Sequence, residues 1–271
     1  MNKKPLLYKM GVFFLGFLFK IFYNPKIIGK ENIPDKGPVI IAGNHVHLYD
    51  QCHVLISTKR YINYMAKKEY FSSKLTSWFF KNVGCIKVDR TKKDDLAVNE
   101  ALGVLNRGGA LGIFPEGTRN ALKKDEIKIL YSKYFNDYSK RKFKSFLKKN
   151  TPKKSQVLLL EKLYNDKKIS LECFYNSLEN TDKCLKKLLE EKIIDKKTYD
   201  DSLILDFKYG AVSLASKTKS VIIPVVVTGT YKFRSNNLTV KIGKSINVDD
   251  KDLKEANLNL RKTMIEMIKE I

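Results

Sequence analysis

Short apolar runs and amphipathic segments alternate over most of the chain. Apolar runs next to turn residues predict five strands, at 37–42, 83–88, 110–114, 220–228 and 238–242. Helical spacing of apolar residues predicts helices at 51–82, 94–107 and 254–271. We expect the last helix to bury Leu258, Met264, Ile265 and Ile268, and Pro224 to mark an edge or a bend of the fourth strand. This alternation is typical of an α/β fold with a mixed, largely parallel sheet flanked by helices.

The N-terminal segment, residues 1–29, combines an apolar stretch with basic flanks. Residues 10–23 carry one charged side chain, Lys20, and no apolar run of the chain reaches the roughly 18 residues of a transmembrane helix. A small-residue cleavage site does not follow the stretch, so we do not expect a cleaved signal peptide. Its phenylalanines and flanking lysines favour a helix in the membrane interface, and a helix buried in the core is the alternative.

The alternation of strands and helices is interrupted between residues 121 and 206. The sequence of this stretch predicts helices almost throughout. Within this stretch, residues 163–178 and 188–203 form an internal repeat with a 25-residue offset. Each copy predicts a helix, a turn and a second helix, whose N-cap is Ser170 in one copy and Asp195 in the other. We therefore expect 121–206 to be a helical insert in a domain formed by residues 30–120 and 207–271. The basic stretch 140–154 fits either a solvated linker or a contact with anionic lipid or a carrier protein.

Basic residues outnumber acidic ones by 52 to 29, which gives a net charge of +23. Such a charge indicates an anionic partner, namely nucleic acid, an anionic membrane surface or a phosphorylated substrate. Arginine supplies only seven of the 52, so a lysine-rich compositional bias also fits. A hydrophobic content of 43% excludes a wholly disordered chain. The four cysteines form no CxxC pair, which indicates a reduced environment and excludes zinc-finger and iron–sulfur spacing.

All three histidines of the chain lie within nine residues, and this cluster allows two interpretations. A metal site could draw on His45, His47, Asp50, Cys52 and His53. Alternatively, His45 and Asp50 form a pair in which the carboxylate fixes the imidazole tautomer and leaves the other ring nitrogen as a base. The pair can meet only if His45 lies on a turn and Asp50 in the first helical turn, because five residues of one continuous helix turn by about 140°.

Two scarce arginines also follow predicted strands. Residues 114–119 (Phe-Pro-Glu-Gly-Thr-Arg) contain Gly117, which permits close approach of the backbone, and Arg119, whose planar guanidinium suits phosphate. Arg90 follows the second predicted strand. Because open α/β sheets bind ligands beyond the carboxyl ends of their strands, we expect His45, Arg90 and Arg119 to converge.

Taken in order, these blocks resemble the motifs of the phospholipid/glycerol acyltransferase family, most closely those of 1-acylglycerol-3-phosphate (lysophosphatidic acid) acyltransferases. The blocks are Asn44-His45-x4-Asp50, Gly84-x4-Asp89-Arg90, Phe114-Pro-Glu-Gly-Thr-Arg119 and Ile223-Pro-Val225, and residues 207–211 look like the FKxGA segment of the family. The resemblance covers about 30–120 and 207–245. Two features depart from it: the long segment between Arg119 and Phe207, and His47, where relatives often carry a small or hydroxyl residue.

This resemblance implies an O-acyltransferase with the glycerolipid acyltransferase fold. His45 would be the general base for the free hydroxyl of 1-acylglycerol 3-phosphate, which attacks an acyl thioester directly to give phosphatidate, and Asp50 would orient His45. The acceptor phosphate would be bound by Arg90, Glu116, Gly117, Thr118 and Arg119. Glu116 could instead brace Arg119 or a backbone turn, Pro224 could line the acyl pocket or serve packing, and Cys52 is expected in the core.

For partners, the resemblance implies acyl-CoA or acyl-ACP (acyl carrier protein) as co-substrate, a lysophospholipid and an anionic membrane surface. It implies no metal, no other cofactor and no nucleic acid. The expected location is the cytoplasmic face of the cell membrane, with a peripheral or monotopic association. A different acceptor, such as glycerol 3-phosphate or another lysophospholipid, and a non-catalytic basic lipid-binding protein are the alternatives. The sequence leaves acyl-chain length and oligomeric state open.

Overall fold

The chain folds into two compact units. The computed structural model describes residues 5–91, 94–234, 236–248 and 252–271. One unit, here called the sheet unit, comprises Met1–Gly117 and Asp206–Ile271, and the other, the helical unit, comprises Thr118–Leu205. The sequence predicts a helical insert over nearly the same stretch, 121–206. Each unit has its own core and is described separately.

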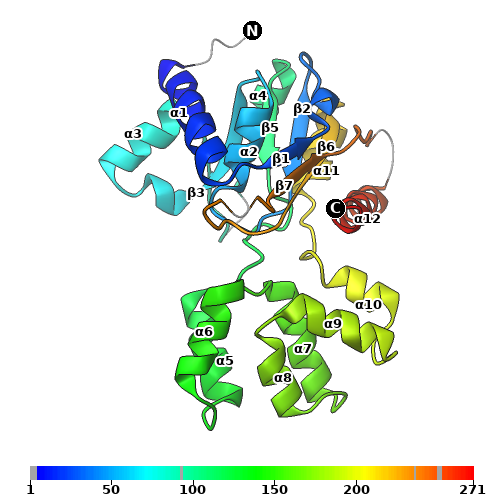
Figure 1. The fold of residues 1–271 in the computed structure, drawn as a ribbon. Coiled ribbons are helices and arrows are strands. Elements are labelled where there is room, and N and C mark those ends of the chain that lie inside the picture. Colours follow the sequence, from blue (N-terminus) through cyan, green and yellow to red (C-terminus); the bar gives the residue numbers. More distant parts are fainter. Residues whose placement is uncertain (1–4, 92–93, 235, 249–251) are drawn as a thin grey trace. The chain divides into compact units, whose positions relative to one another are not determined.

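A seven-stranded sheet forms the centre of the sheet unit, in the order β1-β7-β6-β2-β5-β3-β4 (Figure 1). Neighbouring strands pair in parallel, except that β6 and β7 are antiparallel. The predicted mixed, largely parallel sheet is therefore confirmed. The strands are β1 (Lys26–Ile28), β2 (Val39–Gly43), β3 (Ile62–Lys67), β4 (Ile86–Val88), β5 (Ala110–Ile113), β6 (Val221–Thr228) and β7 (Thr239–Ile242).

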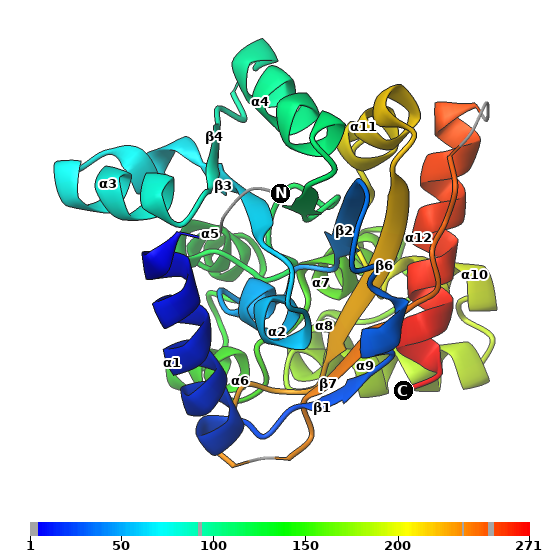
Figure 2. The same cartoon turned by 90° about the horizontal axis from the view of Figure 1, so that it is seen from above.

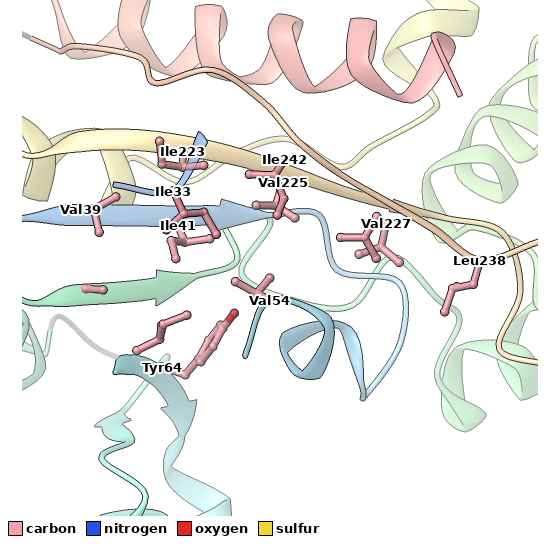
Figure 3. Close-up of a cluster of buried hydrophobic side chains, with 13 residues drawn as sticks. Ile33, Val39, Ile41, Val54, Tyr64, Ile223, Val225, Val227, Leu238 and Ile242 are labelled. Atoms are coloured by element: carbon pink, nitrogen blue, oxygen red, sulfur yellow. The ribbon is translucent and has the colours of Figure 1, made fainter. Parts of the chain in front are cut away.

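Both faces of the central strands are buried, as their continuous apolar sequences require. Every residue of β2 is buried, and alternate residues face opposite sides of the sheet because side chains of a strand have a period of two. Ile41 and Val225 belong to a cluster that also takes in Val54 of α2 (Figure 3). Ile40 and Ile222, both fully buried, belong to the alternate positions of the same strands.

Helices cover the two faces of the sheet. Figure 2 shows α1 and α2 on one side and α11 and α12 on the other. The helices of this unit are α1 (Leu6–Phe22), α2 (Asp50–Ser57), α3 (Lys74–Asn82), α4 (Asp95–Asn106), α11 (Gly210–Thr218) and α12 (Leu253–Lys269), with the short 3-10 helices η1 (Lys30–Asn32) and η2 (Lys68–Phe71). No helix in the described part of the chain has both the length and the hydropathy needed to cross a bilayer. The location of α1 in a membrane interface remains a prediction.

The prediction of one helical stretch over 51–82 was wrong. The chain instead forms α2, then β3, η2 and α3. In β3 the buried residues are Ile62, Tyr64 and Ala66, a period of two that pairs the strand with β5 and β4. The density of aromatic residues concealed this alternation. β1, which was not predicted, has only three residues and is too short to show a period.

Pro224 does not lie at an edge, because β6 pairs with β2 on one side and β7 on the other. Between the bridge Ile222–Ile246 and the pair Val225–Ile242, β6 advances three residues while its partner advances four. An extra residue on one strand is a β-bulge, which locally interrupts the ladder, and proline has no N–H of its own to donate to that ladder. Proline is tolerated inside the sheet at this bend for that reason.

The predicted apolar face of the C-terminal helix is partly wrong. Leu258 is 58% exposed, whereas Met264 and Ile265 are buried as expected and Ile268 is half-buried. Two residues turn a helix by about 200°, so Leu258 lies opposite the fully buried Leu260. The buried residues of α12 are Ala256, Asn257, Leu260, Met264, Ile265 and Met267.

Six helices are described in the helical unit, and the two copies of the repeat adopt the same local structure. Ser170 and Asp195 each accept a hydrogen bond from the backbone N–H three residues ahead, which caps the helix that follows. Lys167 and Lys192, which end the preceding turns, both have a φ of 57°. The helices are α5 (Lys124–Tyr134), α6 (Lys140–Asn150), α7 (Lys154–Asn165), α8 (Leu171–Ser177), α9 (Thr181–Glu190) and α10 (Lys196–Asp201).

Candidate functional site

The loop that leaves β2 is fixed by Asn44, which is 4% exposed. Its Nδ2 donates to the carbonyl of Val227 over 3.0 Å, and its Oδ1 accepts from the N–H of Val227 over 2.7 Å. The Asn44 side chain thus continues the ladder between β2 and β6 beyond the end of β2. This anchor gives a defined direction to the backbone of the next residue, His45.

His45 and Asp50 form a close pair: Nδ1 lies 2.9 Å from Oδ2. Asp50 is the first residue of α2, and His45 lies on the turn before it, so the two side chains can meet. The aspartate side chain is fully buried and the histidine side chain is 15% exposed. Phe114 stacks on the imidazole with ring centroids 4.1 Å apart and an angle of 14°, which fixes the plane of the ring.

Asp50 accepts hydrogen bonds from three further donors. Its Oδ2 accepts from the N–H groups of Val46 and His47, each over 2.7 Å, and its Oδ1 accepts from the hydroxyl of Tyr231 over 2.6 Å. A carboxylate accepts from all of them, so the proton of the His45 imidazole is assigned to Nδ1 and the lone pair to Nε2. Within the described residues, Nε2 has no hydrogen-bond partner, which leaves it available to a hydroxyl group.

Tyr231 was not found from the sequence. It lies three residues after the end of β6, and it brings a buried hydroxyl to the aspartate. Burial and then the charge of Asp50 raise its pKa well above the ordinary value, so the hydroxyl remains a donor. Its ring stacks on His47 at 4.1 Å and meets Tyr23 edge-on at 5.4 Å. The only available signal was its place after a strand parallel to β2.

The loop after β5 braces the turn at His45. Glu116 is 4% exposed, and its Oε1 accepts the backbone N–H of His45 over 2.6 Å. This contact corresponds to the interpretation of Glu116 as a brace for a backbone turn. The next residue, Gly117, has a φ of +67°, and a Cβ there would come within 2.9 Å of the Lys208 side chain. The left-handed conformation favours glycine here, whereas the Lys208 side chain could move aside.

Arg90 reaches the same loop from the end of β4. Its Nη1 donates to the carbonyl of Gly117 over 2.6 Å. The neighbouring Asp89 accepts from the hydroxyl and N–H of Thr91 and lies 2.9 Å from Nζ of Lys68. The hydrogen bonds from Thr91, followed by that from Lys68, hold the pKa of the Asp89 carboxyl well below its ordinary value. The turn that carries Arg90 is thus held by the contact of Arg90 with Gly117 and by the contacts of Asp89 with Thr91 and Lys68.

Contacts join three of the predicted loops in sequence: His45 to Glu116, and Gly117 to Arg90. Their strands β2, β5 and β4 run in the same direction, so the loops emerge at one edge of the sheet. Thr118 and Arg119 belong to the helical unit, where Arg119 is exposed. Their place in the site remains a prediction, as does a role of Pro224 in an acyl pocket; Pro224 is buried in β6.

The geometry gives no support to a metal site. Among the described residues, no three His, Cys, Asp or Glu side chains gather closely enough to hold an ion. Burial raises the pKa of the Cys52 thiol to about 12, so it stays protonated in the core. Burial also lowers the pKa of His53 to about 4; this ring is fully buried beside Phe19. His45 combines a carboxylate partner on Nδ1 with an Nε2 that faces no hydrogen-bond partner among the described residues.

Comparison with known proteins places the chain in a family. The acyltransferase family model matches residues 24–228. The 1-acyl-sn-glycerol-3-phosphate acyltransferase of Bacillus subtilis is 34% identical over 97 residues, which cover 35% of this chain and 49% of that protein. The enzyme of the same name from Borreliella burgdorferi is 33% identical over 111 residues, 38% of this chain and 44% of that protein. The chain thus spans about half the length of the curated relatives it matches.

Among solved structures, the crystal structure of the 1-acyl-sn-glycerophosphate (LPA) acyltransferase PlsC from Thermotoga maritima superposes with a TM-score of 0.52. The alignment covers 97% of this chain and 78% of that chain, with 17% sequence identity. At this identity the likeness demonstrates a shared fold.

Proposed function

This chain belongs to the acyltransferase family, and we propose that it transfers a fatty acyl group from an acyl thioester to the free hydroxyl of 1-acylglycerol 3-phosphate, giving phosphatidate. The observation that carries the proposal is the His45–Asp50 pair, with 2.9 Å between Nδ1 and Oδ2. The names of the curated relatives support the choice of acceptor. Membership of the family alone would leave the acceptor open.

His45 acts as general base through Nε2. It takes the proton of the acceptor hydroxyl as the oxygen attacks the thioester carbonyl, and the thiolate leaves when the tetrahedral intermediate collapses. The proton held on His45 then neutralises the departing sulfur. General-base assistance of this kind contributes about 10²–10⁴-fold to the rate. The reaction needs no nucleophile on the protein, which agrees with the protonated, buried Cys52.

Asp50 positions the imidazole and stabilises its protonated form. The carboxylate has its own donors in Val46, His47 and Tyr231, so it is held in place before substrate binds. The stacked Phe114 ring restricts the remaining rotation of His45. Such preorganisation lowers the barrier because little has to move during the reaction.

The acceptor phosphate binds at the loops after β4 and β5. Arg90 offers further N–H groups beyond the one given to Gly117, and Arg119 supplies a second guanidinium. Gly117 and Thr118 contribute close backbone and hydroxyl contacts. Glu116 supports this loop by accepting the N–H of His45. It does not bind the phosphate itself, because its carboxylate and the phosphate would repel each other.

The donor is either acyl-CoA or acyl-ACP, and the enzyme works at the cytoplasmic face of the cell membrane. The acceptor and the product are lipids, so the protein has to reach them in a bilayer. The exposed phenylalanines of α1 and the net charge of +23 support binding to an anionic membrane surface.

The test is an activity panel on the purified protein. Lysophosphatidate and glycerol 3-phosphate are each supplied with acyl-CoA and with acyl-ACP, and products are identified by mass spectrometry. We expect phosphatidate from the wild-type protein and none from His45→Ala. Transfer to glycerol 3-phosphate alone would assign a different acceptor, and no transfer in any arm would contradict the proposal.

A further inference from the structure

Helix α3 has no buried residue along its nine positions. Its apolar side chains Leu75, Trp78 and Phe79 are 76%, 56% and 44% exposed. They stand at positions i, i+3 and i+4, so they share one face of the helix. A helix of this length is marginal on its own and usually depends on packing of its apolar face. Here that face is turned outward.

Helix α1 also exposes a face of large apolar side chains. Its members are Leu6, Met10, Phe13, Phe14, Phe17, Leu18, Ile21 and Phe22, each more than 40% exposed. The opposite face packs on α2, where a Cβ on Gly16 would lie 3.3 Å from Ile56. At the end of α1, Phe22 meets the exposed Phe233 with ring centroids 5.4 Å apart. Large contiguous apolar surfaces of this kind mark interaction sites.

The two helices lie on the same side of the sheet unit. Both views show α3 beside the N-terminal part of α1 (Figures 1 and 2). The exposed apolar residues of α1 and α3 therefore belong to neighbouring helices, and Phe233 adjoins them at the end of α1.

The charged residues within α1 and α3 are all basic. Lys9 and Lys20 of α1 are exposed, as are Lys74 and Lys81 of α3, and neither helix contains an acidic residue. Apolar and aromatic side chains with lysines beside them suit the boundary between acyl chains and anionic headgroups. A protein partner of matching chemistry would have to offer an equally large apolar face.

We propose that α3 and Phe233 dock, together with α1, onto an anionic phospholipid surface, with Leu75, Trp78 and Phe79 entering the headgroup–acyl boundary. The inference rests on the proposed function, since lipid substrates are the reason for this protein to sit on a bilayer. It goes further by assigning a second, internal membrane-docking helix, held by the folded sheet unit through the contact of Phe80 with Tyr70.

The experiment uses the only tryptophan of the chain, Trp78, as the reporter. The full-length protein is mixed with vesicles of phosphatidylcholine and phosphatidylglycerol, with and without brominated acyl chains. We expect the emission of Trp78 to shift to shorter wavelength and to be quenched by the bromines. Unchanged emission from protein that sediments with the vesicles, or failure to bind them, overturns the proposal. No substrate is present, so this result is independent of whether acyl transfer is found.

A pair of variants gives a second measurement. Leu75→Ser with Phe79→Ser should weaken vesicle binding about tenfold or more, because two apolar side chains no longer leave water on docking. The matched control, Leu96→Ser with Leu258→Ser, removes two exposed apolar residues of α4 and α12 and should leave binding unchanged. Equal affinity of both variants counts against docking through α3. If the α3 variant unfolds, the quenching of Trp78 in the wild-type protein remains the test of whether α3 docks on the bilayer.

Discussion

Tyr231 donates a hydrogen bond of 2.6 Å to Oδ1 of Asp50, the carboxylate whose other oxygen holds His45. The two residues are 181 positions apart. Since Val46 and His47 bind only Oδ2, Tyr231 is the only hydrogen-bond donor recorded for Oδ1 within the described part of the chain. The loop after β6 thus contributes to the orientation of the proposed base.

We expect Tyr231→Phe to lower kcat about tenfold or more with little change in KM for the acceptor. A hydrogen bond to a charged group contributes about 1.5–3 kcal/mol, and its loss lets the carboxylate rotate away from His45. The matched control is Tyr23→Phe, whose ring meets Tyr231 but whose hydroxyl has no recorded hydrogen bond. Steady-state kinetics of both variants test this; equal kcat values would show that Oδ1 needs no partner.

His53 predicts how stability depends on pH. Its ring nitrogens are buried without a hydrogen-bond partner among the described residues, and burial lowers its pKa to about 4 from an ordinary 6.5. Between these values the unfolded chain binds a proton that the folded chain does not, so the free energy of unfolding falls as the pH falls from 6.5 towards 4. The full shift corresponds to about 3 kcal/mol.

Replacement of His53 by Leu should remove this contribution. We expect the variant to gain about 2–3 kcal/mol relative to wild type at pH 4.5, over and above any difference at pH 7.5. Urea unfolding at the two pH values measures it. The control is His47→Gln, which changes a partly exposed imidazole. A wild-type pH slope retained in His53→Leu would mean that another group titrates in this range.

Asn44 links the site to the sheet, and its replacement by Ala should affect both stability and activity. The variant leaves the buried N–H and C=O of Val227 without partners, which costs about 3 kcal/mol in the free energy of unfolding. Because His45 follows directly, we also expect a lower kcat. Asn136→Ala, which removes an exposed side-chain contact to Ser132, should be close to neutral. Chemical denaturation distinguishes the two; equal stability would contradict the anchoring role.

Arg119 is expected to bind the acceptor phosphate, so Arg119→Ala should mainly raise the acceptor KM. The loss of a charge-assisted hydrogen bond of about 1.5–3 kcal/mol corresponds to a tenfold or larger increase. Arg141→Ala, which removes an exposed arginine of α6, is the control. An unchanged KM for lysophosphatidate would remove Arg119 from the phosphate site.

Much of the fold was accessible from the sequence because its strong signals are local. The strands at 37–42 and 220–228 are continuous apolar runs, and the caps at Ser170 and Asp195 depend on residues three positions ahead. β3 was missed because aromatic residues on either side masked its period of two. Tyr231 was missed because its partner is 181 residues away, and no local pattern records such a contact.

The helical unit should be removable without loss of the sheet unit. Where the chain leaves and re-enters the sheet unit, the N–H of Lys208 donates to the carbonyl of Pro115 over 2.9 Å. The re-entering segment is also held by Asn257, whose Nδ2 donates to the carbonyl of Phe207 over 3.0 Å. A short linker can therefore close the gap at little entropic cost.

We expect a protein that lacks residues 121–205, joined by a short Gly-Ser linker, to unfold cooperatively. The isolated helical unit should also fold, because its core is its own: Phe135, Phe143, Phe174, Leu160, Leu178 and Leu185 are less than 2% exposed. Circular dichroism with thermal unfolding tests both pieces. Insoluble protein with every linker length would contradict this prediction. It would mean that the sheet unit depends on the insert, and that the hydrogen bond between Lys208 and Pro115 is not enough to hold the two ends together.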